Sequence, residues 1–240
     1  MGFAPRILGL LALAGLTACA YQDPGAPESR EHPFYTRVTW FSYVGGDDIR
    51  QQCLAGAPER YRLIYNGIYG EQVRTYDVVG EPQSGGALMS IRVLGSADVG
   101  GVTPQTVLFG QPSDAPTRVR IDEAQLRDLA SSMDRSGYLQ PAPAGLRLPS
   151  RRFYWVASGC RDGIFKFNAW RYPSERFNNL KFPIKLASFD PTGIPFNPPI
   201  PVGQIRNPGT TDSIRSPDGG AAIFELTVAE NGLVRGPTPF

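Results

Sequence analysis

One stretch of this sequence, Asp122 to Ser136, has the apolar spacing of a long amphipathic helix, and this limits the fold more than any other feature. Its apolar side chains recur three and four residues apart, at Leu126, Leu129, Ala130 and Met133. The other regular segments are short and strand-like, and 27 glycines and 23 prolines interrupt the chain. We therefore expect an α+β fold: a mainly antiparallel β-sheet with one main helix, about 122–136, packed on it in a single domain.

Seven segments have the alternation or the residue types of β-strands. They are Arg37–Tyr43, Glu59–Asn66, Gln72–Val79, Leu88–Leu94, Phe153–Ser158, Ile164–Tyr172 and Ala221–Val228. Two sets of side chains should each share a core face: Tyr61, Leu63 and Tyr65 on one strand, and Met89, Ile91 and Val93 on another. Asp162-Gly163 predicts a tight turn between the fifth and sixth strands.

Two short helices and a proline-rich segment complete the predicted elements. Asp47 can cap a helix that runs to Leu54 and carries Cys53, and Ser174 can start a second one. Segment 183–208 contains seven prolines, which lack the N–H donors that a central strand needs. We expect it to lie on the surface as an ordered belt or to stay partly mobile.

The chain begins with the pattern of an export signal. Its first 18 residues carry one charge, Arg6, and an apolar run over residues 7–16, about half of the ~20 residues that a membrane-spanning helix needs. The sequence that follows, Leu16-Thr17-Ala18-Cys19, resembles the lipobox of bacterial lipoprotein precursors. The alternative is a soluble secreted protein with a chance cysteine near its cleavage site.

The resemblance implies how the chain is processed and where in the cell it is located. Residues 1–18 would be a signal peptide, residues 19–35 a lipidated Cys19 with a flexible tether, and residues 36–240 a single α+β domain. The acyl chains on Cys19 would attach the protein permanently to the cell envelope. Because Ala20 rather than aspartate follows the cysteine, the resemblance favours the periplasmic face of the outer membrane.

Two cysteines remain in the domain once Cys19 is set aside, Cys53 and Cys160. An even number of cysteines in an oxidising compartment predicts a disulfide between them. The alternative is two separate buried thiols that pack as small apolar side chains.

The sequence lacks the residues that most catalytic and cofactor sites need. The one histidine, His32, lies in the predicted tether, so we expect neither a His-dependent catalytic site nor a metal site, and no cofactor motif is present. Paired carboxylates are the remaining catalytic possibility. The candidate pairs are Asp47/Asp48, Glu71/Asp77 and Asp162/Glu175, although capping, strand and turn roles suit them better.

Basic residues are concentrated in one part of a chain whose formal net charge is only +2. Residues 147–185 hold nine Lys/Arg and two acidic residues, interleaved with aromatic side chains. Five cations are the candidate ligands for anionic lipids or glycans of the envelope: Arg151, Arg152, Arg161, Lys166 and Arg171. The alternative, which we favour, is a purely structural role for this segment. It would then be an amphipathic hairpin on which Phe165, Phe167 and Ala169 pack inward, while Lys166 and its neighbours project into solvent. Nucleic acid is not expected as a partner of an exported chain.

These features lead to one main functional prediction and two alternatives. We expect a lipid-anchored envelope protein with a non-enzymatic binding or structural role. An envelope hydrolase that acts on glycan or peptidoglycan through two carboxylates is the first alternative. An accessory subunit of an envelope assembly, marked by a large exposed apolar patch, is the second.

Overall fold

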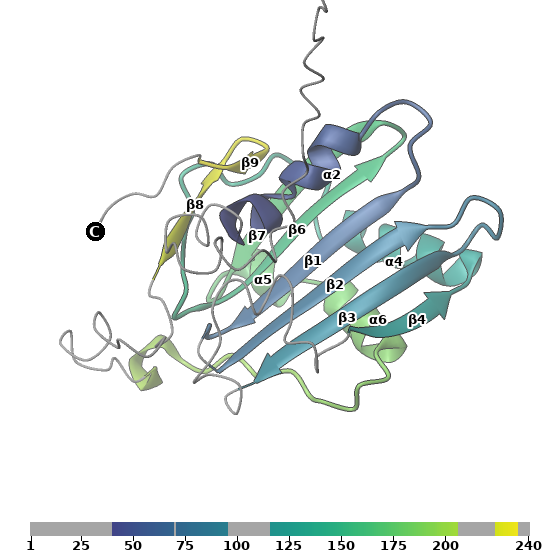
Figure 1. Cartoon of the computed structure of the whole chain (residues 1–240). Coiled ribbons are helices and arrows are strands. Elements are labelled where there is room, and N and C mark those ends of the chain that lie inside the picture. Colours follow the sequence, from purple (N-terminus) through teal and green to yellow (C-terminus); the bar gives the residue numbers. More distant parts are fainter. Residues whose placement is uncertain (1–39, 70, 96–115, 206–223, 235–240) are drawn as a thin grey trace, which may run out of the picture.

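A six-stranded antiparallel sheet forms the centre of the computed structural model, which describes residues 40–69, 71–95, 116–205 and 224–234 of the 240-residue chain (Figure 1). The strand order is β4-β3-β2-β1-β6-β7. The strands are β1 Arg60–Gly67, β2 Gln72–Gly80, β3 Ala87–Gly95, β4 Thr117–Ile121, β6 Phe153–Arg161 and β7 Ile164–Arg171. The expected α+β fold with a mainly antiparallel sheet is therefore confirmed.

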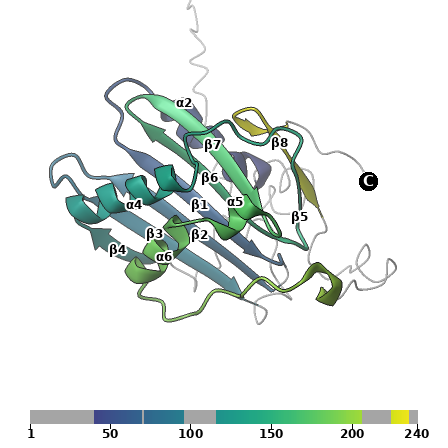
Figure 2. The ribbon, with the colours of Figure 1, turned by 180° about the vertical axis from the view of Figure 1, so that it is seen from behind.

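Helices cover one face of this sheet (Figure 2). They are α4 Glu123–Arg135, α5 Glu175–Asn178 and α6 Phe182–Phe189. The apolar stripe of α4 packs on the two predicted sets of inward side chains, those on β1 and those on β3. The predicted helix start is confirmed, because Asp122 and Gln125 form a reciprocal capping box. Gly137, with a φ of 79°, follows the end of the helix.

The opposite face is covered over its β1, β6 and β7 half by two helical segments and a small sheet (Figure 1). The helical segments are residues 40–45 and α2 Asp47–Gln52, which together we call the helical cover. The small sheet contains β5 Arg147–Pro149, β8 Glu225–Ala229 and β9 Gly232–Leu233. Both faces of the hairpin formed by β6 and β7 are therefore buried, and β6 reads as a nearly continuous buried run.

The predicted strand Arg37–Tyr43 is wrong in its described part, because residues 40–45 are helical. Its aromatic and β-branched residues favour a strand locally. The buried side chains of Trp40 and Val44 are four residues apart, however, so one helical face puts both against the sheet. Residues 37–39 lie outside the described part. The helix cap was also misplaced: Gly46 is the N-cap, and α2 ends one residue before Cys53.

The predicted hairpin between Phe153 and Tyr172 is confirmed, with a longer first strand than expected. Asp162 and Gly163 form the two-residue turn, with φ values of 55° and 71°. Gly159 therefore lies within β6 rather than in the turn. A Cβ at Gly159 would approach the Tyr61 ring to 2.5 Å, which explains why glycine stands there.

The described part of the proline-rich segment, residues 183–205, divides into a helix and a belt. Pro183 lies at the start of α6, where a proline needs no N–H partner, and this helix was not predicted. Residues 190–205 form the expected surface belt and end in the short 3₁₀ helix η3 Val202–Gln204. Strands β4 and β5 were also missed, since each is short. The predicted strand Ala221–Val228 is present as β8 from Glu225 onward, while residues 221–223 lie outside the described part.

Candidate functional site

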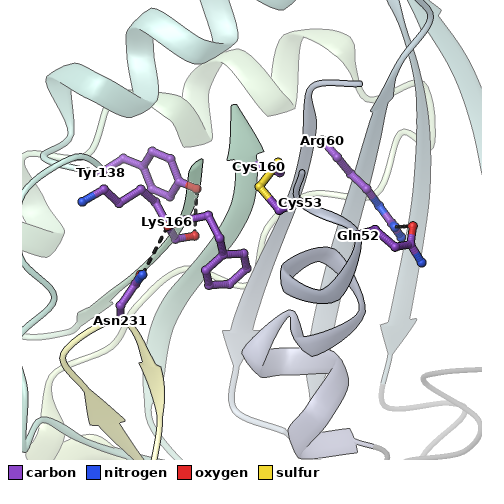
Figure 3. The surroundings of a disulfide bond; sticks show 8 residues. Gln52, Cys53, Arg60, Tyr138, Cys160, Lys166 and Asn231 are labelled. Atoms are coloured by element: carbon purple, nitrogen blue, oxygen red, sulfur yellow. Dashed lines mark hydrogen bonds between the residues drawn. A yellow bond between two sulfur atoms is a disulfide. The ribbon is translucent and has the colours of Figure 1, made fainter. Parts of the chain in front are cut away.

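The predicted disulfide is present between Cys53, which directly follows α2, and Cys160 on β6 (Figure 3). The two Cα atoms are 5.5 Å apart, and 107 positions of sequence separate the cysteines. The bond therefore fixes the end of the helical cover to the tip of the β6–β7 hairpin. Closing a loop of this length restricts the unfolded chain strongly.

The five predicted anion-binding cations do not form one surface, because they divide between the two ends of the hairpin. Arg151 and Arg152 directly precede β6, and Arg171 is paired with Tyr154 near the start of that strand. Arg161 and Lys166 lie near the turn. At about 3.3 Å per residue, the nine residues of β6 separate the two groups by roughly 30 Å.

Near the turn, Arg161 is already paired with a carboxylate, and Lys166 is only partly exposed. Arg161 donates to both carboxylate oxygens of Asp134 at 3.1 Å. Lys166 is half-buried, and its carbonyl accepts a hydrogen bond from the Tyr138 hydroxyl at 3.0 Å (Figure 3). Trp170, on the same face of β7 as Lys166, is buried. The expectation that this face of the hairpin projects into solvent is therefore wrong for Asn168 and Trp170, which are buried, while Lys166 stays partly exposed.

At the other end, Arg151, Arg152 and Arg171 form what we call the arginine end. None of the three makes an ion pair with another described residue. Arg171 donates to the Arg147 carbonyl at 2.8 Å, while the Arg147 side chain itself pairs with Glu225. Guanidinium groups without a carboxylate partner are suited to bidentate contacts with phosphates or carboxylates.

The backbone that carries the arginine end is held in place by buried hydrogen bonds. Ser150, which is 1% exposed, accepts at its carbonyl from Tyr69 N at 2.8 Å and from Asn66 Nδ2 at 2.9 Å. Asn66 Nδ2 also donates to the Arg152 carbonyl at 2.6 Å. Ser150 pairs in addition with the backbone of Phe224, through its N–H and its hydroxyl. Arg151 and Arg152, both partly exposed, therefore lie on a segment that these hydrogen bonds hold in place.

Two of the candidate carboxylate pairs do not meet. Glu71 and Asp77 are six residues apart along one strand direction, about 20 Å by strand rise. Asp162 lies at the hairpin tip, whereas Glu175 follows the far end of β7. Neither separation matches the roughly 5–10 Å that a glycosidase needs. The adjacent pair Asp47 and Asp48 is divided between other partners.

An arginine on β1 brings together two of these carboxylates from different pairs. Arg62, 3% exposed, donates to Asp77 at 2.7 Å and to both oxygens of Asp48 at 2.7 and 3.1 Å. The Tyr43 hydroxyl donates to Asp77 at 2.6 Å, and its ring lies 3.7 Å from the Arg62 guanidinium carbon. No local pattern predicts this cluster, since Arg62 alternates with Tyr61 and Leu63 as an outward-facing residue would.

The ionisation of the cluster around Arg62 favours a structural role. Burial alone would raise the pKa of the Asp48 carboxyl, but hydrogen bonds and charge from Arg62, with the charge of Arg60, lower it below its usual range. Burial, together with the charge of Asp77, raises the pKa of Tyr43 far above its ordinary value. A general acid needs a raised carboxyl pKa, so Asp48 has the opposite tuning.

A second unpredicted cluster lies on the other face and fixes the belt. Arg74, 1% exposed, donates to Asp190 at 2.9 Å and to the Ile194 carbonyl at 2.5 Å. The Tyr76 hydroxyl donates to the same Asp190 oxygen at 2.8 Å. The guanidinium carbon also lies 4.3 Å from the centre of the Phe196 ring. A buried ion pair thus joins the centre of the sheet to the proline-rich segment.

Metal and membrane-spanning features are lacking in the described residues. No group of three or more His, Cys, Asp or Glu side chains there could hold a metal ion. No helix in the same ranges has the length and apolar character needed to cross a membrane. Cys19, His32 and the predicted tether lie outside the described residues.

Comparison with known proteins gave no match: no family model fits the sequence, and neither a curated protein nor a solved structure was found to be similar. Only the residues and geometry described above therefore bear on the function of this chain.

Proposed function

We propose that this chain is a lipid-anchored envelope protein, held by acyl chains on Cys19 at the periplasmic face of the outer membrane. The disulfide Cys53–Cys160 is the observation that carries the proposal. Structural disulfides persist in oxidising compartments, which an exported chain reaches and a cytosolic one does not. The leader and the lipobox-like Leu16-Thr17-Ala18-Cys19 point to the same compartment from an unrelated part of the sequence.

Within the envelope, the proposed role is binding or structural rather than enzymatic. The described carboxylates that come together, Asp48 and Asp77, are both bound to Arg62 and brace the helical cover against the sheet. The rigid arginine end is the best available site for an anionic envelope component, because its three guanidinium groups have no described carboxylate partner. The hydrolase alternative finds less support, since two of its three carboxylate pairs are widely separated.

The anchor is tested by metabolic labelling with a fatty acid in a bacterial host. We expect the wild-type chain to incorporate label and a Cys19→Ser variant to lose it. A Cys53→Ser/Cys160→Ser variant is the matched control, because it removes two cysteines and keeps Cys19. Equal labelling of the wild type and Cys19→Ser would overturn the proposal, as would a mature N-terminus at any other residue.

A further inference from the structure

The helical cover shows at which end of the sheet the chain enters the domain. Trp40 is the first described residue, and its ring centre lies 6.0 Å from that of Tyr69 and 6.5 Å from that of Phe224. Both partners hydrogen-bond to Ser150, which immediately precedes Arg151. The N-terminal segment therefore joins the domain beside the arginine end.

From that point the cover runs along the hairpin toward its tip. A Cβ built on Gly46 would meet the Ser158 side chain, so the middle of the cover crosses β6 near that residue. Cys53 is then bonded to Cys160, close to the turn. The disulfide consequently marks the end of the sheet opposite to the point of attachment, roughly 30 Å away by strand rise.

We propose that the arginine end docks on the phosphate groups of the same membrane that holds the lipid anchor. This inference rests on the proposed function, because an acylated Cys19 would tether the domain to a membrane through the segment that enters at this end. Acyl chains and a basic patch are a common combination of membrane signals, and each lysine or arginine near an anionic surface adds to binding. Lipid phosphate also matches the bidentate geometry of arginine.

Docking would set the orientation of the domain. The arginine end would face the head groups, and the disulfide with the hairpin tip would point away from them. Arg161 lies near the tip and is already paired with Asp134, so the charge of Arg161 is not needed at the membrane. The two ends of one hairpin would thus have different roles.

The test uses the chain from residue 19 to 240 with Cys19→Ser, which keeps every described residue and cannot be acylated. Its binding is measured by flotation with phosphatidylcholine vesicles that do or do not contain phosphatidylglycerol. We expect binding to the anionic vesicles only, and binding that weakens as salt is added. Replacing Arg151, Arg152 and Arg171 with glutamine should weaken it about fivefold per arginine, or roughly a hundredfold in total.

A matched triple variant separates local docking from net charge. Arg118→Gln/Arg127→Gln/Arg135→Gln removes the same charge from exposed positions on β4 and α4, and it should bind like the parent. Equal loss in both triple variants, or no loss in either, would overturn the inference. Equal inhibition by inorganic phosphate at concentrations matching the lipid phosphate would also overturn it, because the ligand would then be a free anion.

A folding control and a milder variant keep the outcome of this test clear. Near-ultraviolet circular dichroism checks that each variant is folded, and the single variant Arg152→Gln replaces the triple one if that fails to fold. Because the vesicle assay uses an unacylated chain, its result is independent of the fatty-acid labelling. Failed labelling overturns the proposed anchor, and failed vesicle binding overturns the docking surface alone.

Discussion

Removing the charge of Asp190 should destabilise the domain strongly, because its partner is buried. The side chains of Arg74 and Asp190 are only 2% and 3% exposed. Breaking a buried ion pair from one side leaves an uncompensated charge and costs about 3–5 kcal/mol. Arg74 would keep the Ile194 carbonyl as a partner, so we place Asp190→Asn at the lower end, about 3 kcal/mol. For a domain of this size, that lowers the melting temperature by roughly 6–12 °C.

Urea denaturation followed by tryptophan fluorescence measures this effect. Trp155 is a suitable reporter, since its ring centre lies 5.7 Å from that of Phe196 in the belt. The matched control is Asp128→Asn, which breaks the Lys185–Asp128 pair, where both side chains are about 40% exposed. An exposed pair of this kind contributes about 1 kcal/mol or less.

A double variant distinguishes loss of charge balance from loss of packing. Arg74→Met/Asp190→Leu removes both charges, so it should be more stable than Asp190→Asn alone. If Asp190→Asn costs no more than Asp128→Asn, the ion pair does not fasten the belt in the way we describe. A double variant that is less stable than the single one would refute the argument from an uncompensated charge.

Three other predictions concern separate parts of the fold. Replacing Cys53 and Cys160 with alanine opens a loop of 107 residues and should lower the free energy of unfolding by about 4–5 kcal/mol in urea titrations; unchanged stability would contradict it. The Asp48 carboxyl should titrate below its usual pKa in NMR spectra, and Arg62→Met should raise that pKa. The contribution of the ionised Asp48 to stability is present above the unfolded pKa of about 4, and it is lost as the pH falls through the lower folded pKa. Asp122→Ala removes one half of the capping box and should cost about 1 kcal/mol by thermal melting, an effect that Asp122→Asn should largely avoid.

Local chemistry made several elements predictable. The start of α4 could be read from Asp122 and Gln125 because a capping box needs only residues three apart. The Asp162-Gly163 turn was readable for a similar reason, since both positions require a positive φ. The disulfide followed from counting cysteines, because setting Cys19 aside as the expected lipidation site leaves only Cys53 and Cys160.

Features that depend on long-range packing could not be predicted from the sequence. Residues 40–45 favour a strand locally, but a helix lets Trp40 and Val44 face the sheet together. The covering of both faces of β7 could not be predicted from its own alternation, so the burial of Asn168 and Trp170 on the expected outer face was missed. The buried partners Arg74 and Asp190 are 116 positions apart, and neither residue has a neighbour in sequence that indicates the other.

The path of the helical cover would have a mechanical consequence if the protein is anchored as we propose, through Cys19. A force on that end reaches Trp40 first and can peel residues 40–52 away from the sheet. It cannot proceed along the chain beyond Cys53 without loading Cys160 directly, because the two are covalently joined. Unravelling under tension should therefore stop at a fixed length, while the strands between these cysteines stay folded.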